Sequence, residues 1–410
     1  MKYNFDKVIS RQGTDAVSVD GFRTYLFDKK DVLNLPCPDS ELIVMWVADM
    51  EFATCPEITD ALKDRVEHGL FGYTEIFNSR FKDSFIGWAK SRYGWEPDRD
   101  HIVTSPGVVP ALYDLIGYIC KPDEKILTLT PSYSYFKSAA DAKGIELLTS
   151  NLVSRDGSFF MDVEDIRTKI KNNKVSLFIL CSPHNPTGRM WTDRELKELG
   201  EICLENKVMI ISDEIHCDIL RKGNHFTPLA KLFPESDQII TCMAPSKTFN
   251  LAGLMFANLI IPNAALRTQW INNHFSSENP LSITAARAAY TSGHAWLDEL
   301  TLYLDDNFKF LKDYLAVHLP KAVFTIPEAT YLAWINISAY FSDEENVALF
   351  FANQAGVLLE GGNMFVSNAK GYIRLNLACP RSRLEEGLRR ITEAIINRPT
   401  RVSSKLVLDK

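Results

Sequence analysis

The sequence predicts an α/β fold built on a mainly parallel sheet, and three observations support this prediction. Short apolar segments recur along the middle of the chain, at residues 125–130, 175–181, 208–212, 238–242 and 258–261. Their nearly continuous apolar character is typical of strands that are covered on both faces. Segments with helical periodicity lie between them, and strands that alternate with helices favour parallel pairing.

The helical segments carry recognisable start signals. Residues 193–203 place apolar side chains at helical spacing, and Thr192 or Asp193 can cap the first turn. Earlier in the chain, a glycine turn at residues 105–109 precedes an apolar helix at residues 110–116. The backbone N–H groups at such a turn, together with the helix dipole, favour an anion.

The C-terminal part of the chain has a different pattern, which indicates a separate α+β unit. From about residue 285 a long helical pattern runs past residue 311. It is followed by strand-like segments at residues 331–337 and 371–377 and by a closing helix at residues 383–391.

Length supports a division into domains. The chain has 410 residues, more than the roughly 250–300 at which single cores stop growing. We expect a large α/β domain at residues 50–285, a smaller α+β domain that contains residues 286–397, and a polar tail at residues 398–410.

Charge and hydropathy argue against two classes of partner. A formal net charge of −7 argues against broad binding to nucleic acid or anionic membranes. No run approaches the roughly 18 apolar residues of a membrane span. The first residues lack the apolar core of a signal peptide, so a cytoplasmic location is expected.

The eight cysteines predict neither a metal site nor a disulfide framework. They are scattered and show no Cys-x-x-Cys pair or metal-ligand spacing, and cytoplasmic thiols stay reduced. Most lie in apolar surroundings, where free cysteine behaves as a small hydrophobe. Cys217, beside His216, is the one candidate for a reactive thiol.

Three residues in a fixed order predict a pyridoxal 5′-phosphate (PLP) site. Lys247 lies between a small-residue turn and an apolar segment, Asp213 ends an apolar run, and Asn185 lies in an Asn-Pro-Thr-Gly turn. PLP needs a lysine amine for its aldehyde, a carboxylate beside its pyridine nitrogen and a donor near its phenolate oxygen. Each residue alone has an ordinary structural explanation, but the combination favours the cofactor. Since each follows a strand candidate, the three should meet at the carboxyl edge of the sheet.

Six motifs resemble those of a known family, and three of them contain Asn185, Asp213 and Lys247. They are residues 46–52 (Trp-Val-Ala-Asp-Met-Glu-Phe), 71–74 (Phe-Gly-Tyr-Thr), 182–188 (Ser-Pro-His-Asn-Pro-Thr-Gly), 213–216 (Asp-Glu-Ile-His), 246–253 (Ser-Lys-Thr-Phe-Asn-Leu-Ala-Gly) and 372–381 (Tyr-Ile-Arg-Leu-Asn-Leu-Ala-Cys-Pro-Arg). Over nearly the whole chain the sequence resembles the fold-type I PLP enzymes of the aminotransferase class I/II group, and within it the MalY/PatB-type cystathionine β-lyases. The resemblance implies a seven-stranded large-domain sheet, a small domain that residues 1–49 join, an active site between the domains, and a homodimer.

The glycine turn is the expected phosphate site. We expect the backbone N–H groups of Gly107, Val108 and Val109 to bind the phosphate, and the Ser246 hydroxyl can add a donor. An ordinary helix start is the alternative explanation of this turn.

The chain departs from many relatives near the phosphate. Those relatives hold it with a serine and an arginine at the positions of Ala244 and Met255. The departure argues against an ordinary aminotransferase and leaves the phosphate short of a cation within the subunit. The resemblance implies that Tyr73 reaches the phosphate of the partner subunit across the dimer interface.

The resemblance assigns two further residues to the cofactor ring. Tyr133 follows a strand candidate and resembles the aromatic residue that stacks on the pyridine ring. His216 stands where transaminases of this fold usually have a tyrosine on the ring oxygen, and histidine there matches the lyase subgroup. Lys247, Asp213 and Tyr133 form the predicted catalytic set.

Arg374 is the expected site of the substrate α-carboxylate. It lies between Ile373 and Leu375 in a strand-like segment, where a buried arginine needs an anion. Its planar fork matches a carboxylate, although a structural salt bridge is an alternative. The Ala48 backbone is expected near that carboxylate, and the role of Asp49 is left open.

The function that the resemblance implies is carbon–sulfur β-elimination. An S-substituted cysteine such as cystathionine would give a thiol, pyruvate and ammonia, with Lys247 as the general base. Two alternatives are an aminotransferase and a PLP-binding regulatory protein that acts on a transcription factor.

Overall fold

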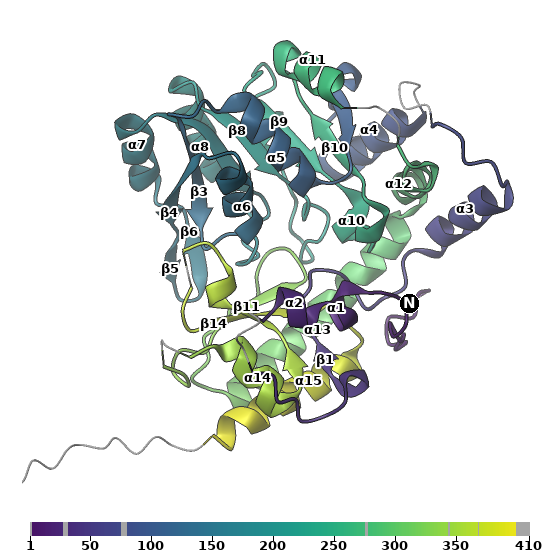
Figure 1. The fold of residues 1–410 in the computed structure, drawn as a ribbon, viewed down its shortest axis with the longest axis vertical. Helices are drawn as coiled ribbons and strands as arrows, with labels where there is room; N and C mark the ends of the chain where they lie inside the picture. The colour runs from purple at the N-terminus through teal and green to yellow at the C-terminus, as the bar shows by residue number, and fades with distance from the viewer. Residues whose placement is uncertain are drawn as a thin grey trace, which may run out of the picture.

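The computed structural model describes residues 2–27, 32–74, 80–274, 278–342, 345–367 and 369–398. Within these residues a seven-stranded sheet, here called the large sheet, has the order β2-β10-β9-β8-β7-β3-β4 (Figure 1). Its strands are β2 (Ile102–Ser105), β3 (Lys125–Thr130), β4 (Glu146–Asn151), β7 (Val175–Cys181), β8 (Met209–Asp213), β9 (Ile239–Met243) and β10 (Ala257–Ile260). Only β10 is antiparallel to its neighbours within this described sheet. The predicted mainly parallel, seven-stranded sheet is confirmed.

The strand boundaries follow the apolar segments closely. Two predicted segments, 125–130 and 175–181, coincide with β3 and β7. The prediction at 208–212 is displaced by one residue, because Asp213 keeps its strand pairing with Cys181 and Cys242. Asp213 is therefore the last residue of β8 rather than the first residue after it.

Helices cover both faces of the large sheet, which explains why its strands are apolar throughout. Alternate residues of β7 point to opposite cores, with Leu177 and Ile179 on one side and Phe178 and Leu180 on the other. The first core includes α5 (Val108–Ile119), α6 (Ser134–Ala142) and α11 (Ala264–Asn273). The second includes α7 (Val163–Asn172), α8 (Asp193–Glu205) and α9 (Leu229–Leu232).

Local capping fixes the start of α8. The Thr192 side chain accepts a hydrogen bond from the Glu195 backbone N–H, and the Glu195 carboxylate accepts from the Thr192 backbone N–H at 2.8 Å. This reciprocal pair satisfies two N–H groups that a helix start leaves without partners. Of the two predicted caps, Thr192 is the one that the structure uses.

A small sheet, with the order β11-β14-β13, lies below the large sheet in Figure 1. It consists of β11 (Leu332–Asn336), β13 (Glu360–Gly361) and β14 (Tyr372–Asn376). Its apolar side chains share a core with α13 (His294–His318), α14 (Val347–Ala355) and α15 (Arg381–Ile396). The pair β1 (Ile43–Val44) and β12 (Val357–Leu358) brings the N-terminal part of the chain into the same core.

The long helix expected from about residue 285 is two helices, so that prediction is wrong in detail. Helix α12 (Pro280–Ser292) ends at Gly293, and α13 begins at the next residue. The Phe249 ring explains why the residue at this break is glycine, because a Cβ at Gly293 would lie 2.3 Å from it. Glycine lets the two helices meet beside this ring and also weakens helical continuity.

The remaining helices lie around this frame. They are α1 (Val17–Asp20), α2 (Phe22–Tyr25), α3 (Pro56–Glu67), α4 (Arg80–Tyr93) and α10 (Pro245–Thr248), and β5 (Val153–Arg155) pairs with β6 (Ser158–Phe160). Helix α12 packs against α3 and α4. No helix in the described ranges is long and apolar enough to cross a membrane. The domain division and the cytoplasmic location stay predictions, and apart from Arg398 the predicted tail lies outside the described residues.

Candidate active site

Four adjacent parallel strands bring the predicted residues to one edge of the large sheet. The strands β9, β8, β7 and β3 are neighbours in that order. Their carboxyl ends lead to Lys247 on α10, Asp213 at the end of β8, Asn185 in the following loop and Tyr133 before α6. Carboxyl ends of parallel strands share an edge, so the topology assembles these side chains at the usual ligand position of such sheets.

Lys247 is a half-buried amine with a backbone acceptor. Its Nζ donates a hydrogen bond to the Ala48 carbonyl oxygen at 2.6 Å. Burial lowers the lysine pKa to about 8; Arg374 acts in the same direction, and Asp49 opposes it. An amine with such a pKa is partly neutral near pH 7–8, which a nucleophile or general base requires.

Asp213 is a buried carboxylate close enough to Lys247 to influence it. Its side chain is 5% exposed and accepts a hydrogen bond from the Ile215 backbone N–H at 3.3 Å. Burial raises its pKa to about 6, while Lys247 lowers it. A cation placed beside this carboxylate would stabilise its ionised form.

The Trp46–Met50 loop crosses the site and is held by side chains from both sides. The carbonyl oxygens of Val47 and Asp49 accept from Asn376 on β14, and that of Met50 accepts from Asn250, which follows α10. Each acceptor is a backbone carbonyl, and burying it without a hydrogen-bond partner would cost free energy. The loop is therefore fixed in position between the two sheets.

The structure also gives Asp49 a partner, which the sequence left open. The Arg11 guanidinium donates to both Asp49 carboxylate oxygens, at 3.0 and 2.6 Å. Such a bidentate pair fixes both side chains in orientation. Asp49 also raises the pKa of Lys247, so it belongs to the electrostatic surroundings of the amine.

Arg374, on β14, joins the small sheet to the site. It is 3% exposed. Its guanidinium donates to Asn185 Oδ1 at 3.0 Å and to the Trp46 carbonyl oxygen at 2.8 Å. It also forms an ion pair with Glu360, its neighbour across the strand pair β13–β14. Its Nε has no hydrogen-bond partner within the described residues. The structural salt bridge is therefore present, and the contact of Arg374 with a substrate carboxylate stays a prediction.

The expected phosphate site is a helix start at the same edge. Gly107 is the N-cap of α5, and Val108 and Val109 are its first helical residues. Strand β2, which leads into this helix, runs in the same direction as β9 because β10 is antiparallel to both. The first backbone N–H groups of α5 therefore lie at the edge that carries Lys247, and helix starts bind anions.

The positions where many relatives have a serine and an arginine for the phosphate are occupied here by Ala244 and Met255. Ser246 precedes Lys247 on α10, and Ala244 is the N-cap of that helix. Met255 is 57% exposed and has a positive φ of 50°. The side chains at these two departing positions supply neither the hydroxyl nor the cation that many relatives have.

Burial favours the neutral forms of both Tyr133 and His216. Burial raises the pKa of the Tyr133 phenol well above its ordinary range. Burial, followed by Lys247 and Arg374, lowers the pKa of His216 well below 6.5. His216 is 3% exposed, and its Nδ1 has no hydrogen-bond partner among the described residues.

A buried network behind α10 fixes the lysine-bearing helix. The Asp218 carboxylate accepts from the Thr248 hydroxyl at 2.8 Å, from Tyr93 at 2.6 Å and from Trp88 Nε1 at 3.1 Å. Cys217, the candidate reactive thiol, lies in this network 3.2 Å from the Tyr93 hydroxyl. Burial raises the Cys217 pKa, so the thiol stays protonated and is a poor nucleophile.

Tyr73 lies apart from the other predicted residues. It follows α3 and is 92% exposed in the single chain. Leu70 and Phe71, just before it, are 68% and 54% exposed. Its role across an interface stays a prediction.

Two residues of the site were missed by the sequence reasoning. Glu360 pairs with Arg374, and the Tyr331 hydroxyl donates to the Ala48 carbonyl at 2.8 Å. An acid directly after the apolar run Val357-Leu-Leu gives a signal for Glu360, because such a charge needs a partner. Tyr331 had no signal of its own, because aromatic residues are common in strands.

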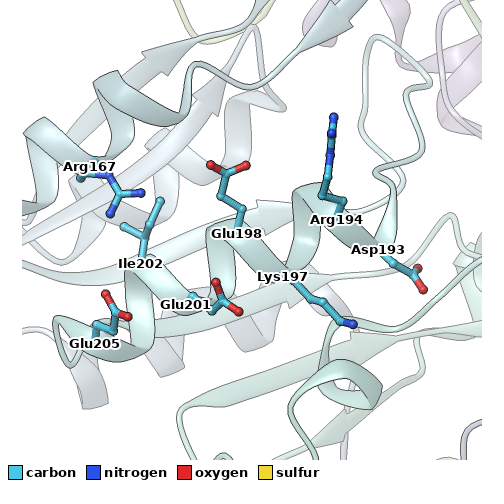
Figure 2. A pocket seen from close by; sticks show the side chains of 8 residues that line it. All are labelled: Arg167, Asp193, Arg194, Lys197, Glu198, Glu201, Ile202 and Glu205. Carbon is cyan, nitrogen blue, oxygen red and sulfur yellow. The ribbon is translucent and has the colours of Figure 1, made fainter.

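A separate surface hollow lies between α7 and α8 (Figure 2). Its side chains carry both signs of charge and include Arg167 and Arg194 beside Glu198 and Glu201. None of the predicted site residues lines it. Mixed exposed charges of this kind are typical of a solvated helix face, so the hollow is not a candidate for the active site.

The donor set at the sheet edge fits PLP in its chemistry. Lys247 supplies an amine, Asp213 a carboxylate and the α5 start an anion site, while the Arg374 Nε and His216 Nδ1 are buried atoms without partners among the described residues. Buried polar atoms are normally hydrogen-bonded, and these two belong to residues that interact electrostatically with Lys247, so they indicate a ligand position near the amine.

Comparison with known proteins shows the family of the chain. The family model for aminotransferase class I and II matches residues 40–391. Cystathionine beta-lyase PatB of Bacillus subtilis (strain 168) is 38% identical over 397 residues, covering 96% of this chain and all of that protein. Protein MalY of Escherichia coli (strain K12) is 30% identical over 398 residues, covering 96% of this chain and 99% of that protein.

A solved structure is similar over the same length. The PLP-bound C–S lyase from Staphylococcus hominis, complexed with the inhibitor L-cycloserine, superposes with a TM-score of 0.93 and 46% identity, covering 96% of this chain and 98% of that one. The predicted fold class and the predicted resemblance are confirmed. By these matches over most of its length, the chain belongs to the aminotransferase class I and II family.

Proposed function

We propose that the protein is a PLP-dependent carbon–sulfur β-lyase that converts L-cystathionine or another S-substituted cysteine to a thiol, pyruvate and ammonia. The observation that carries the proposal is Lys247, a partly buried amine with a pKa of about 8 at the sheet edge where Asp213 and Asn185 converge. The names of PatB and of the Staphylococcus hominis enzyme support the lyase reaction in particular.

Each residue has a proposed task. When bound, PLP supplies an electron sink that stabilises negative charge at the substrate Cα. Lys247 holds the cofactor covalently and, when released, removes the Cα proton. Asp213 keeps a positive charge on the ring nitrogen, and Asn185 supplies a donor toward the ring oxygen. The Arg374 guanidinium orients the substrate α-carboxylate.

The remaining proposed contacts surround the ring and the phosphate. Tyr133 would stack on the ring, and neutral His216 would face its oxygen side. The backbone N–H groups at Gly107, Val108 and Val109 bind the phosphate, and Ser246 adds a hydroxyl. The Ala48 backbone lies on the substrate side.

Pyruvate release tests the reaction class. The PLP-loaded protein is incubated separately with cystathionine, cystine, cysteine and S-alkylcysteines, without any keto acid, and pyruvate is measured with a coupled lactate dehydrogenase assay. A lyase produces pyruvate and the expelled sulfur compound in equal amounts: a thiol from cystathionine and S-alkylcysteines, sulfide from cysteine and a persulfide from cystine. Turnover that requires an added keto acid, without thiol release, would instead indicate an aminotransferase.

We also propose a homodimer with shared active sites. The support is a row of exposed apolar side chains after α3 that includes Leu70, Phe71 and Tyr73, each more than half exposed in the single chain. Such patches mark protein interfaces, and two-fold dimers are the commonest symmetric assemblies. The lack of a cationic side chain at Met255 makes a phosphate contact from a partner chemically useful.

Subunit mixing tests the shared site. Tyr73→Phe and Lys247→Ala subunits are each expected to have weak or no activity, and they are mixed under conditions where exchange is verified by mass spectrometry. If Tyr73 acts across the interface, one site of each mixed dimer carries both substitutions and the other carries neither, so activity partly returns. No recovery after verified exchange would place Tyr73 in its own subunit.

A further inference from the structure

Two donors from different parts of the fold meet on one backbone oxygen. Lys247 Nζ, on α10 beside the large sheet, donates to Ala48 O at 2.6 Å. The hydroxyl of Tyr331, directly before β11 of the small sheet, donates to the same oxygen at 2.8 Å. A carbonyl oxygen has two lone pairs, so it accepts both hydrogen bonds.

Tyr331 is held rigidly in this position. Its side chain is 0% exposed, and its carbonyl accepts from the Leu377 backbone N–H at 2.8 Å. The preceding residue, Thr330, donates its N–H to the Ile219 carbonyl at 2.7 Å, which ties this segment to the chain that comes after β8. Burial raises the Tyr331 pKa far above its ordinary range, so the hydroxyl keeps its proton and acts as a donor.

We propose that Tyr331 is a positioning residue for Lys247, and that its hydroxyl holds the Ala48 carbonyl as the docking point of the lysine amine whenever that amine is not bonded to the cofactor. The inference rests on the proposed role of Lys247 and deepens it. Bonding to the cofactor would take the amine away from this oxygen, and its release would let the contact form again. Tyr331 keeps the acceptor in place and hydrogen-bonded throughout.

The second hydrogen bond also sets how strongly the amine is held. A carbonyl that already accepts from Tyr331 is a weaker acceptor for an ammonium group. Without that hydroxyl, Ala48 O would stabilise the protonated lysine more strongly. The Lys247 pKa would then rise and less of the amine would be available as a base.

Other charged groups around Lys247 stay the same when Tyr331 is changed to phenylalanine. Asp49, Asp213 and Glu360 favour the ammonium form, whereas Arg374 opposes it and His216 is uncharged. A shift in the lysine titration therefore reports the lost hydroxyl.

The test compares Tyr331→Phe with a matched control, Tyr290→Phe. Tyr290 is also a buried tyrosine, and its hydroxyl accepts a hydrogen bond from Asn258 Nδ2 at 2.9 Å. Each substitution removes one buried hydrogen bond, but only Tyr331 contacts the acceptor of Lys247. Both variants are first checked for native circular dichroism and thermal unfolding.

The first readout does not depend on turnover. Full-length protein without PLP is treated with acetic anhydride over a series of pH values, and acetylation of the Lys247 peptide is quantified by mass spectrometry. We expect the midpoint to lie near the pKa of about 8 in the unmodified chain. In Tyr331→Phe it should move up by about half a unit, because one neutral hydrogen bond no longer competes with the ammonium group for the Ala48 oxygen.

The second readout is the pH profile of the PLP-loaded enzyme. The acid limb of kcat should move to higher pH in Tyr331→Phe, with kcat reduced roughly threefold below that limb and KM nearly unchanged. Tyr290→Phe should match the unmodified chain in both readouts. If lyase activity is absent but the labelling midpoint moves, the proposed reaction fails and the role of Tyr331 stands.

Three results would overturn the inference. One is an unmodified chain in which Lys247 labels like an ordinary exposed lysine. The second is a labelling midpoint that is unchanged or lower in a folded Tyr331→Phe protein. The third is an equal shift in Tyr290→Phe, which would attribute the effect to general loosening of the core.

Discussion

Substitutions in the Arg374–Glu360 ion pair can separate an effect on substrate binding from an effect on folding stability. Glu360 is largely buried, with a side-chain exposure of 15%, and its ion-pair partner Arg374 is 3% exposed. Burial raises the Glu360 pKa and Arg374 opposes that rise. Removing Arg374 alone leaves a buried carboxylate without its counter-charge, which typically costs about 3–5 kcal/mol of folding stability. Arg374→Ala therefore tests two effects at once.

The double variant Arg374→Ala/Glu360→Gln separates them. An amide needs no counter-charge, so we expect the double variant to regain at least ~1–2 kcal/mol of the stability that Arg374→Ala loses. It cannot regain the contact to a substrate carboxylate. Breaking a buried charge-assisted contact corresponds to about 2–5 kcal/mol, so kcat/KM should fall roughly 30-fold or more in both variants.

The measurements are urea unfolding monitored by circular dichroism and kcat/KM for an S-substituted cysteine. Arg374→Lys is the matched control, because it keeps the charge but loses the planar fork. Full recovery of kcat/KM in the double variant would refute the reasoning. Arg374 would then serve only to neutralise Glu360, and the substrate carboxylate would bind elsewhere.

Three other ionisable groups can be tested by substitution. Lys247→Ala should abolish turnover and the visible absorption of bound PLP. In the unmodified protein, borohydride reduction followed by peptide mapping should label Lys247. A label on another lysine would contradict its role. Asp213→Asn should still bind some PLP but lose elimination by orders of magnitude, because an amide cannot stabilise a positive ring nitrogen; near-normal turnover would mean that another residue faces that nitrogen. Burial raises the Glu214 pKa from 4.5 to about 8, so its contribution to stability is present at low pH and is lost as pH rises through about 8. Glu214→Gln should flatten this fall in the free energy of unfolding between pH 5 and pH 9, and an unchanged slope in urea titrations would contradict it.

The large sheet and its catalytic edge were predictable from local pattern. Continuous apolar runs such as residues 175–181 have no helical period, and each ends at a turn. Parallel strands then place the residues after their carboxyl ends on one edge, which is why Lys247, Asp213 and Asn185 could be grouped from sequence alone. The boundary at Asp213 was displaced because strand pairing continues through a polar residue.

The small-sheet side of the site was less accessible to sequence reasoning. The pairing of Glu360 with Arg374 depends on the register of two antiparallel strands, and a shift by one residue would turn the carboxylate to the other face. The need for glycine at position 293 comes from the Phe249 ring, which is distant in sequence. Contacts of this kind exist only after packing has placed the elements.

The role of the Ala48 carbonyl could not be predicted from the sequence. Its contacts also link the lysine to the rest of the site. A backbone oxygen has no residue-specific signature, yet this one accepts from Lys247 and Tyr331. Two residues earlier, the Trp46 carbonyl accepts from Arg374. The amine that starts the proposed reaction and the guanidinium that orients its substrate are thus attached to one short loop. A shift of that loop would alter both contacts together, so the lysine and the anion site share a single geometry.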